Sequence, residues 1–143
     1  MSATVDTNVL VYASNADDPL HEQARTLVER LAAGPEIVYL FWPVVLGYLR
    51  IVTHPSILPK PLSPKVAMRN VEALLDRPHV RAPGEADGFW PIFRATAGER
   101  PRGNDVPDAH LAALMRQHGV RLIWTRDRDF RRFDGIEARD PFD

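Results

Sequence analysis

Apolar residues along this chain follow two spacings, short continuous runs and repeats every three or four positions, which are typical of buried strands and amphipathic helices respectively. The clearest repeat lies between Pro19 and Gly34, with apolar positions at Leu20, Ala24, Leu27, Val28 and Leu31. Its Gly34-Pro35 end is a common helix stop. Helices are also expected over 43–52, 63–77, 105–119 and, interrupted by Pro91, 88–96.

Short apolar segments predict strands between these helices. They lie at 4–5, 37–41, 79–81 and 122–124. The segment Asp6-Thr7-Asn8, followed by the apolar run Val9–Tyr12, either continues the first strand or turns it into a short helix. Periodicity does not decide between these two interpretations.

Strands that alternate with helices predict an α/β domain with a mainly parallel sheet and right-handed crossovers. A chain of 143 residues can bury one sizeable core and is too short for two ordinary domains, so a single domain over 1–143 is expected. Ligands of such sheets gather beyond the carboxyl ends of the strands. Functional acids should therefore follow strands or begin the next helices.

The amino-acid composition excludes several kinds of functional site. The chain has no cysteine, so disulfides, thiolate metal sites and cysteine nucleophiles are excluded. No apolar stretch approaches the roughly 20 residues that span a bilayer, and no signal peptide is evident, so a soluble, uncleaved cytoplasmic protein without a membrane partner is expected. The net charge of -1 gives no general sign of a nucleic-acid partner, but the acid-free segment between Glu36 and Glu72 is locally basic.

Three aspartates satisfy the strand-end rule. Asp6 follows the first strand, Asp127 follows the segment 122–126, and Asp108 lies in the first turn of the preceding helix. Taken singly, each has an ordinary structural role in a turn or at a helix start. Local stabilisation does not require three acids remote in sequence to share one end of a sheet, so their coincidence favours a common site.

Converging carboxylates repel one another unless cations neutralise them, which indicates a metal site. Hard oxygen ligands favour Mg²⁺ or Mn²⁺, ions that can orient a phosphate and activate water. Hydrolysis of a phosphodiester is therefore the leading predicted chemistry, with Asp6, Asp108 and Asp127 as catalytic residues and metal ligands. Secondary roles are expected for Asn8, Asp105, Thr125 and Asp129.

Three segments resemble the motifs of PIN-domain ribonucleases, and in particular the VapC-type toxins of bacterial toxin-antitoxin pairs. They are Asp6-Thr7-Asn8-Val9-Leu10, Asp108-Ala109-His110-Leu111-Ala112-Ala113 and Thr125-Arg126-Asp127-Arg128-Asp129-Phe130, with further support from Leu49-Arg50-Ile51-Val52-Thr53-His54-Pro55. The resemblance covers essentially the whole chain. It implies a three-layer α/β/α fold and a Mg²⁺- or Mn²⁺-dependent endonuclease acting on structured RNA such as tRNA or ribosomal RNA. It also implies inhibition by a VapB-like antitoxin, and assembly as a homodimer or a toxin-antitoxin hetero-oligomer.

The chain departs from the family pattern at one acidic position. The family usually carries a glutamate in the helix after the second strand, whereas the helix over 42–50 has no acid here. Matching Leu49-Arg50 to the pattern places the vacancy at Gly47, with Val45 as a second counterpart. Glycine inside a helix costs about 1 kcal/mol relative to alanine, so Gly47 needs a reason. A naturally reduced site, an engineered inactivation and tight helix packing all remain open.

Basic side chains are the expected RNA contacts, because cations bind a polyanion independently of its sequence. The residues predicted for this role are Arg50 and Arg126, together with Lys60, Lys65 and Arg69. One competing hypothesis is an inert PIN scaffold that binds RNA or antitoxin without cutting. Another is a phospho-acceptor or phosphatase domain with Asp6 as nucleophile, but no companion motif supports it.

Overall fold

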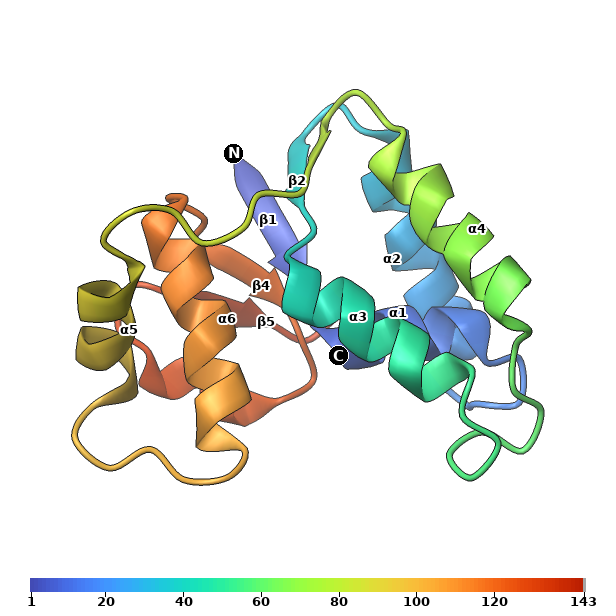
Figure 1. Cartoon of the computed structure of the whole chain (residues 1–143). Helices are drawn as coiled ribbons and strands as arrows, with labels where there is room; N and C mark the ends of the chain where they lie inside the picture. The colour runs from blue at the N-terminus through green and yellow to red at the C-terminus, as the bar shows by residue number, and fades with distance from the viewer. Residues whose placement is uncertain (143) are drawn as a thin grey trace.

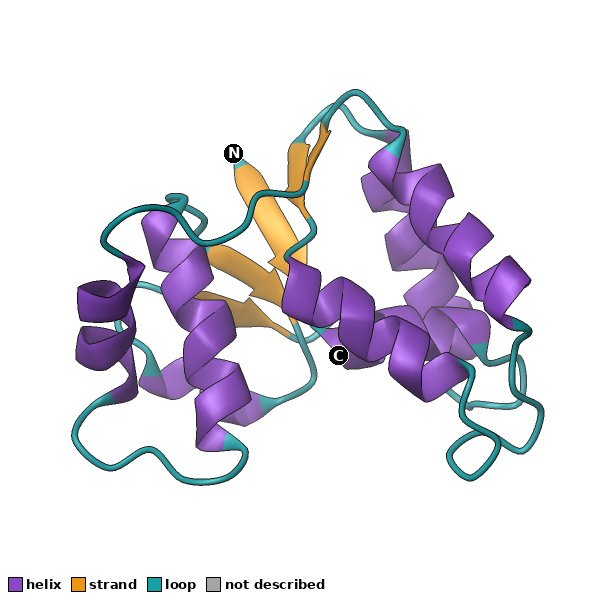
Figure 2. Cartoon of the chain, viewed as in Figure 1, coloured by secondary structure: helices purple, strands orange, loops and turns teal. Residues whose placement is uncertain are grey.

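The computed structural model describes residues 1–142, which form a parallel sheet of five strands flanked by helices (Figures 1 and 2). The strands are β1 (Ser2–Val5), β2 (Ile37–Tyr39), β3 (Val80–Arg81), β4 (Leu122–Trp124) and β5 (Glu137–Arg139). The helices are α1 (Thr7–Ser14), α2 (His21–Ala33), α3 (Trp42–Val52), α4 (Pro64–Leu75), α5 (Phe89–Ala97) and α6 (Asp105–Gln117), with a short 3₁₀ helix, η1 (Arg128–Arg132).

The strand order is β3-β2-β1-β4-β5, and every pairing is parallel. The chain moves from β1 outward to β3 and then returns past β1 to β4, so right-handed crossovers place its helices on opposite faces of the sheet. Figure 1 shows α5 and α6 on one side and α2 and α4 on the other. The predicted α/β fold is therefore confirmed.

The direction of the strand order reverses between β1 and β4. These central strands pair through Thr4 opposite Ile123 and Val5 opposite Trp124. In open parallel sheets a crevice forms outside the carboxyl ends of two strands at such a switch point. The topology therefore places a binding crevice beyond Val5 and Trp124.

The ambiguous segment at Asp6 is a strand that turns into a helix. β1 ends at Val5, and the Asp6 side chain caps α1 by accepting a hydrogen bond from the backbone amide of Thr7 at 2.7 Å. Val9, Leu10 and Val11 are buried in α1, so the apolar run belongs to a helix in the core. A cap satisfies an amide that has no partner within the first helical turn.

Helices α2, α3, α4 and α6 confirm the predicted ones, and the hydroxyl of Ser63 caps α4 by accepting from the amide of Val66 at 3.2 Å. The predicted interruption at Pro91 is wrong. Pro91 is the third residue of α5, where the first turn needs no amide donor from it, so the helix is continuous. Strand β5 and helix η1 were not predicted, because Glu137–Arg139 has no strong apolar pattern and lies at the sheet edge.

Among residues 1–142, no helix combines the length and the apolar character needed to cross a membrane.

Candidate functional site

Asp6 lies at the switch point, directly after β1. Its Oδ1 accepts the Thr7 amide, and its Oδ2 accepts a hydrogen bond from the Thr125 hydroxyl at 2.9 Å. Its own amide donates to the carbonyl of Trp124 at 3.0 Å. Burial raises the pKa of the Asp6 carboxyl, the two hydrogen bonds oppose that rise, and repulsion from Asp127 adds to it. Asp6 is therefore a fixed carboxylate in an environment that disfavours its charge.

Thr125 connects the first and third predicted acids. Its hydroxyl oxygen donates to Asp6 and accepts the backbone amide of Asp127 at 2.9 Å, and the residue is only 2% exposed. Asp127 in turn caps η1, because its Oδ1 accepts the amide of Asp129 at 2.8 Å. A continuous hydrogen-bonded path therefore links two acids that are 121 positions apart in the sequence.

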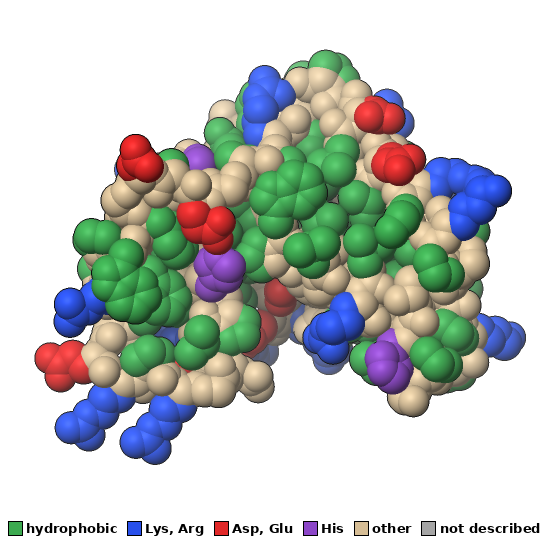
Figure 3. Space-filling model, viewed as in Figure 1, with side chains coloured by type: hydrophobic (Ala, Val, Ile, Leu, Met, Phe, Trp, Pro, Cys, Tyr) green, Lys and Arg blue, Asp and Glu red, His purple; other side chains and the backbone are tan. Residues whose placement is uncertain are grey.

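Asp108 approaches the same site from the first turn of α6. Burial and then repulsion from Asp127 raise its pKa to about 6, with smaller contributions from Asp6 and Asp129, while Arg132 lowers it. Mutual repulsion of this kind requires the carboxylates to lie close together in a medium that screens them poorly. The structure therefore brings Asp6, Asp108 and Asp127 to one end of the sheet. Figure 3 shows acidic side chains inside a notch of the surface, with cationic side chains at its edge.

The residues of this site suit a hard divalent cation only in part. All the donors are carboxylate or hydroxyl oxygens, which Mg²⁺ and Mn²⁺ prefer. Within the described residues, however, no three acidic or histidine side chains are grouped closely enough to hold an ion together. Mg²⁺ usually keeps several waters and takes one or two carboxylates from the protein. The donor set therefore fits a hydrated ion better than an ion enclosed by protein ligands.

Gly47 lies in α3 against the residue that follows Asp6. A Cβ atom at position 47 would lie 3.3 Å from both Cγ2 and Oγ1 of Thr7, closer than side chains normally pack. Val45 is 2% exposed and lines a cavity among α1, α2, α3 and α4. Of the three reasons left open by the sequence, tight packing thus has direct structural support, and Gly47 is the candidate that borders the acidic site.

This contact predicts energetic coupling between Thr7 and Gly47. Gly47→Ala should give little stabilisation or a loss, because the gain of about 1 kcal/mol in helix propensity is offset by crowding against Thr7. In a Thr7→Ala background, the same change should stabilise the protein by about 1 kcal/mol. Urea unfolding of the two single variants and the double variant measures the coupling. Equal effects of Gly47→Ala in both backgrounds would show that the contact has no energetic weight.

The remaining predicted residues lie at the surface. Asn8 and Asp105 are exposed, and Asp129 contributes to the repulsion at Asp108. Arg126 is exposed between Thr125 and Asp127. The other predicted cations, Arg50 on α3 and Lys60, Lys65 and Arg69 farther along the chain, are also exposed, and within residues 1–142 no hydrogen bond or ion pair joins them to the acids.

Arg132 belongs to the site but is not among the residues predicted from the sequence. Its Nη2 lies 3.5 Å from Oδ1 of Asp105 and 3.7 Å from Oδ2 of Asp108. The segment 126–132 contains four arginines, and its sequence does not distinguish Arg132 from the others. Helix η1, which was not predicted, determines which of these arginines faces the acids.

Comparison with known proteins agrees with this arrangement. Residues 3–136 match the PIN domain family. The chain is 60% identical to Ribonuclease VapC48 of Mycobacterium tuberculosis, over 99% of each chain.

Solved structures have the same fold. One is VapC20 of Mycobacterium tuberculosis, described as a sarcin-ricin loop cleaving toxin, with a TM-score of 0.66 and 22% identity over 94% of this chain and 98% of that one. Another is VapBC2 of Rickettsia felis bound to a promoter DNA fragment, with a TM-score of 0.68 and 16% identity over 97% and 98% of the two chains. With a full-length VapC relative and the site at the expected switch point, the chain belongs to the VapC ribonucleases of the PIN-domain family.

Proposed function

We propose that this VapC ribonuclease is a Mg²⁺- or Mn²⁺-dependent endonuclease that cuts structured RNA, tRNA or ribosomal RNA, with Asp6, Asp108 and Asp127 as its catalytic acids. The observation that carries the proposal is the convergence of these three acids at the β1–β4 switch point, where the charge of Asp127 adds to the burial that raises the pKa of Asp6 and of Asp108. Such repulsion costs stability, and a bound cation would relieve it. The sarcin-ricin loop activity for which VapC20 is described supports RNA as the substrate.

Asp6, Asp108 and Asp127 would hold a hydrated ion, in part through its bound waters, and that ion would activate water and stabilise the charge that develops on the phosphate. The other residues position these ligands. The Thr125 hydroxyl fixes the orientation of Asp6 and the backbone of Asp127, and its burial excludes water from that contact. Asp108, with a pKa of about 6, can exchange a proton near neutral pH before a cation binds.

The direct test is cleavage of RNA by the purified, antitoxin-free chain. Total bacterial RNA is incubated with Mn²⁺, with Mg²⁺ or with EDTA, and the new RNA ends are mapped by sequencing. Discrete ends that appear only with a divalent cation are expected. Equal cleavage in EDTA would exclude the metal-dependent mechanism, and the absence of ends under every condition would exclude nuclease activity on these RNAs.

A catalytically inert scaffold that binds RNA or antitoxin is the second candidate. The absence of an acid at Gly47 and of any group of three metal-binding side chains in residues 1–142 favours it. A Gly47→Glu variant in a Thr7→Ala background, which removes the crowding atoms, tests it. Cleavage by this variant and not by the unmodified chain would identify a disabled site, whereas cleavage by the unmodified chain would exclude the inert scaffold.

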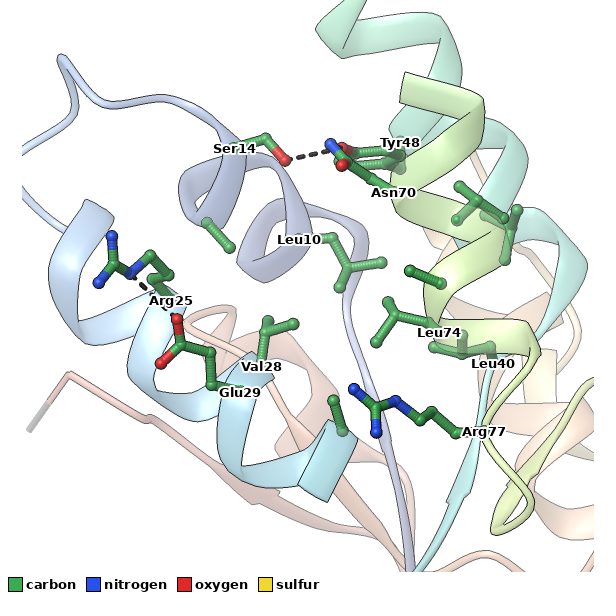
Figure 4. A pocket seen from close by; sticks show the side chains of 15 residues that line it. Leu10, Ser14, Arg25, Val28, Glu29, Leu40, Tyr48, Asn70, Leu74 and Arg77 are labelled. Atoms are coloured by element: carbon green, nitrogen blue, oxygen red, sulfur yellow. Dashed lines mark hydrogen bonds and ion pairs between the residues drawn. The ribbon is translucent and has the colours of Figure 1, made fainter. Parts of the chain in front are cut away.

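We further propose a VapB-like antitoxin as the partner, seated in the cavity between the helices. This cavity of about 260 Å³ is lined mainly by apolar side chains, among them Leu10, Val28, Val45 and Leu74 (Figure 4). At its polar edge Tyr48 shares its hydroxyl with Ser14 at 2.6 Å and accepts from Asn70 at 3.1 Å.

Charge at the edge of the cavity defines the expected partner. Arg25 is paired with Glu29 at 3.2 Å, whereas no acidic side chain of residues 1–142 forms an ion pair with Arg77. An amphipathic helix with an apolar face and a carboxylate beside it would satisfy both the lining and Arg77. Binding there would form a toxin-antitoxin hetero-oligomer; whether the free chain is a homodimer is a separate prediction.

Arg77→Glu should weaken binding of a co-purified VapB-like antitoxin by about tenfold or more, because a rim attraction becomes a repulsion. Arg69→Glu is the matched control, since Arg69 is an exposed arginine of α4 outside the cavity lining. Isothermal titration calorimetry gives both affinities. Equal losses in the two variants would indicate general electrostatics and contradict docking at this cavity.

A further inference from the structure

The acidic site includes one positively charged side chain, that of Arg132. The Nη2 atom of Arg132 lies within ion-pair distance of two acids of α6, 3.5 Å from Asp105 and 3.7 Å from Asp108. The positive charge of Arg132 lowers the pKa of Asp108, whereas the neighbouring aspartates raise it, so the arginine offsets part of their repulsion. An incoming RNA strand meets the same cation, because the phosphate to be cut must lie beside the catalytic acids.

Two contacts besides these ion pairs hold the Arg132 side chain in place. Its Nη1 donates to the carbonyl of Asp129 at 2.7 Å, and its guanidinium carbon lies 4.3 Å from the centre of the Phe133 ring. Phe133 is buried and packs in turn on Phe130, so the ring that supports the guanidinium is part of the core. A guanidinium anchored by a carbonyl and an aromatic face loses little further entropy on binding an anion.

The anchored side chain is still accessible. It is 37% exposed, and a guanidinium has five N–H donors, of which the contacts above use only some. Neighbouring Arg131 is also exposed, but no ion pair or side-chain hydrogen bond holds it within residues 1–142. Arg132 therefore differs from the surrounding basic surface in being both fixed and directed toward the acids.

We propose that Arg132 is the phosphate-contacting residue of this ribonuclease site, binding a phosphate oxygen of the RNA strand and orienting it against Asp108. The inference rests on the proposed nuclease function. Planar guanidinium donors match phosphate oxygens in pairs, whereas lysine offers a point charge. Before RNA arrives, Asp105 and Asp108 keep the same cation in position, and their negative charge is reduced, so the site repels the strand less.

Arg132→Gln, Arg132→Lys and the matched control Arg131→Gln test this role. Binding of a bacterial tRNA mixture is measured in EDTA by fluorescence anisotropy over a range of salt. For Arg132→Gln, the slope of log affinity against log salt should fall by about 0.7 to 0.9, the value for one phosphate contact. Arg131→Gln should keep the slope of the unmodified chain. An unchanged slope in Arg132→Gln, or equal losses in both variants, would overturn the proposal.

The kinetics of RNA cleavage distinguish a phosphate contact by Arg132 from a purely structural role of this residue. With Mn²⁺ and saturating RNA, Arg132→Gln should lower kcat at least about tenfold, Arg132→Lys less, and Arg131→Gln not at all. If Arg132→Gln unfolds more readily in urea, Arg132→Lys decides: a retained slope with a reduced kcat supports the proposal, and a kcat equal to that of the unmodified chain overturns it. If the unmodified chain cuts no RNA, the nuclease proposal fails, while the salt slopes in EDTA still test the phosphate contact.

Discussion

Asp6→Asn should reduce metal-dependent RNA cleavage by at least about a hundredfold, because it removes a negative ligand and with it much of the charge stabilisation that a bound cation supplies. The fold should survive this change. The asparagine carbonyl can still accept the Thr7 amide at the start of α1, and the asparagine amide can donate to Thr125, which is able to rotate its hydroxyl. The loss should therefore appear in kcat at saturating metal and RNA, measured by the rate of formation of mapped RNA ends.

Asp17→Asn is the matched control, since Asp17 is an exposed acid in the loop after α1 with no side-chain hydrogen bond or ion pair among residues 1–142. Its cleavage rate should equal that of the unmodified chain, and both variants should unfold at similar urea concentrations. Full activity of Asp6→Asn would remove Asp6 from the catalytic site. Equal losses in Asp6→Asn and Asp17→Asn would point to a general effect of charge on RNA binding.

The strand-end rule accounts for what the sequence could predict about this site. Asp6, Asp108 and Asp127 were selected because they follow strands or begin a helix, and parallel strands bring such positions to one edge. The rule works because it needs only the positions at which strands end and helices begin, and apolar periodicity indicates these positions well. The structure adds the Thr125 hydroxyl that joins two of these acids.

Features that depend on how helices meet were not predictable in the same way. The crowding of Gly47 by Thr7 results from packing of α3 on α1, and sequence periodicity contains no information about that contact. Arg132 required helix η1 and the Phe133 ring to be placed before its direction was known. The edge strand β5 is only three residues long and has a single small apolar residue between two exposed charged ones, so it exists through pairing with β4 and not through its own pattern.

The acidic site holds its negative charges in an unfavourable environment. Burial and repulsion oppose ionisation of Asp6 and Asp108, while Thr125 and Arg132 offset only part of that cost. A protein that only needed stability would gain by losing these negative charges, whereas a site that binds a divalent cation needs them. In the absence of a bound cation, the free energy of unfolding should therefore increase when one of the acids is replaced by a neutral residue.

Asp108→Asn should stabilise the cation-free protein above pH 6 and change its stability little near pH 4. The folded-state pKa of Asp108, about 6, lies above the value of about 3.9 for an unfolded chain. The stabilisation that accompanies the protonated carboxyl is therefore fully present below about pH 4 and is lost as the pH rises through 6. Asparagine avoids this loss, for a gain of up to about 3 kcal/mol, reduced by screening because the Asp108 side chain is 21% exposed.

Urea unfolding in EDTA at pH 4, 6 and 8 measures this gain, with Asp17→Asn as the control that should show none. At pH 8, saturating Mg²⁺ or Mn²⁺ should make the unmodified chain more stable than Asp108→Asn. A ligand that binds only the folded state stabilises the unmodified chain more than a variant that lacks one carboxylate. Destabilisation by Asp108→Asn at pH 8 in EDTA would mean that its ion pair with Arg132 outweighs the repulsion from Asp127. The acids would then be a structural cluster with no unfavourable charge for a cation to relieve.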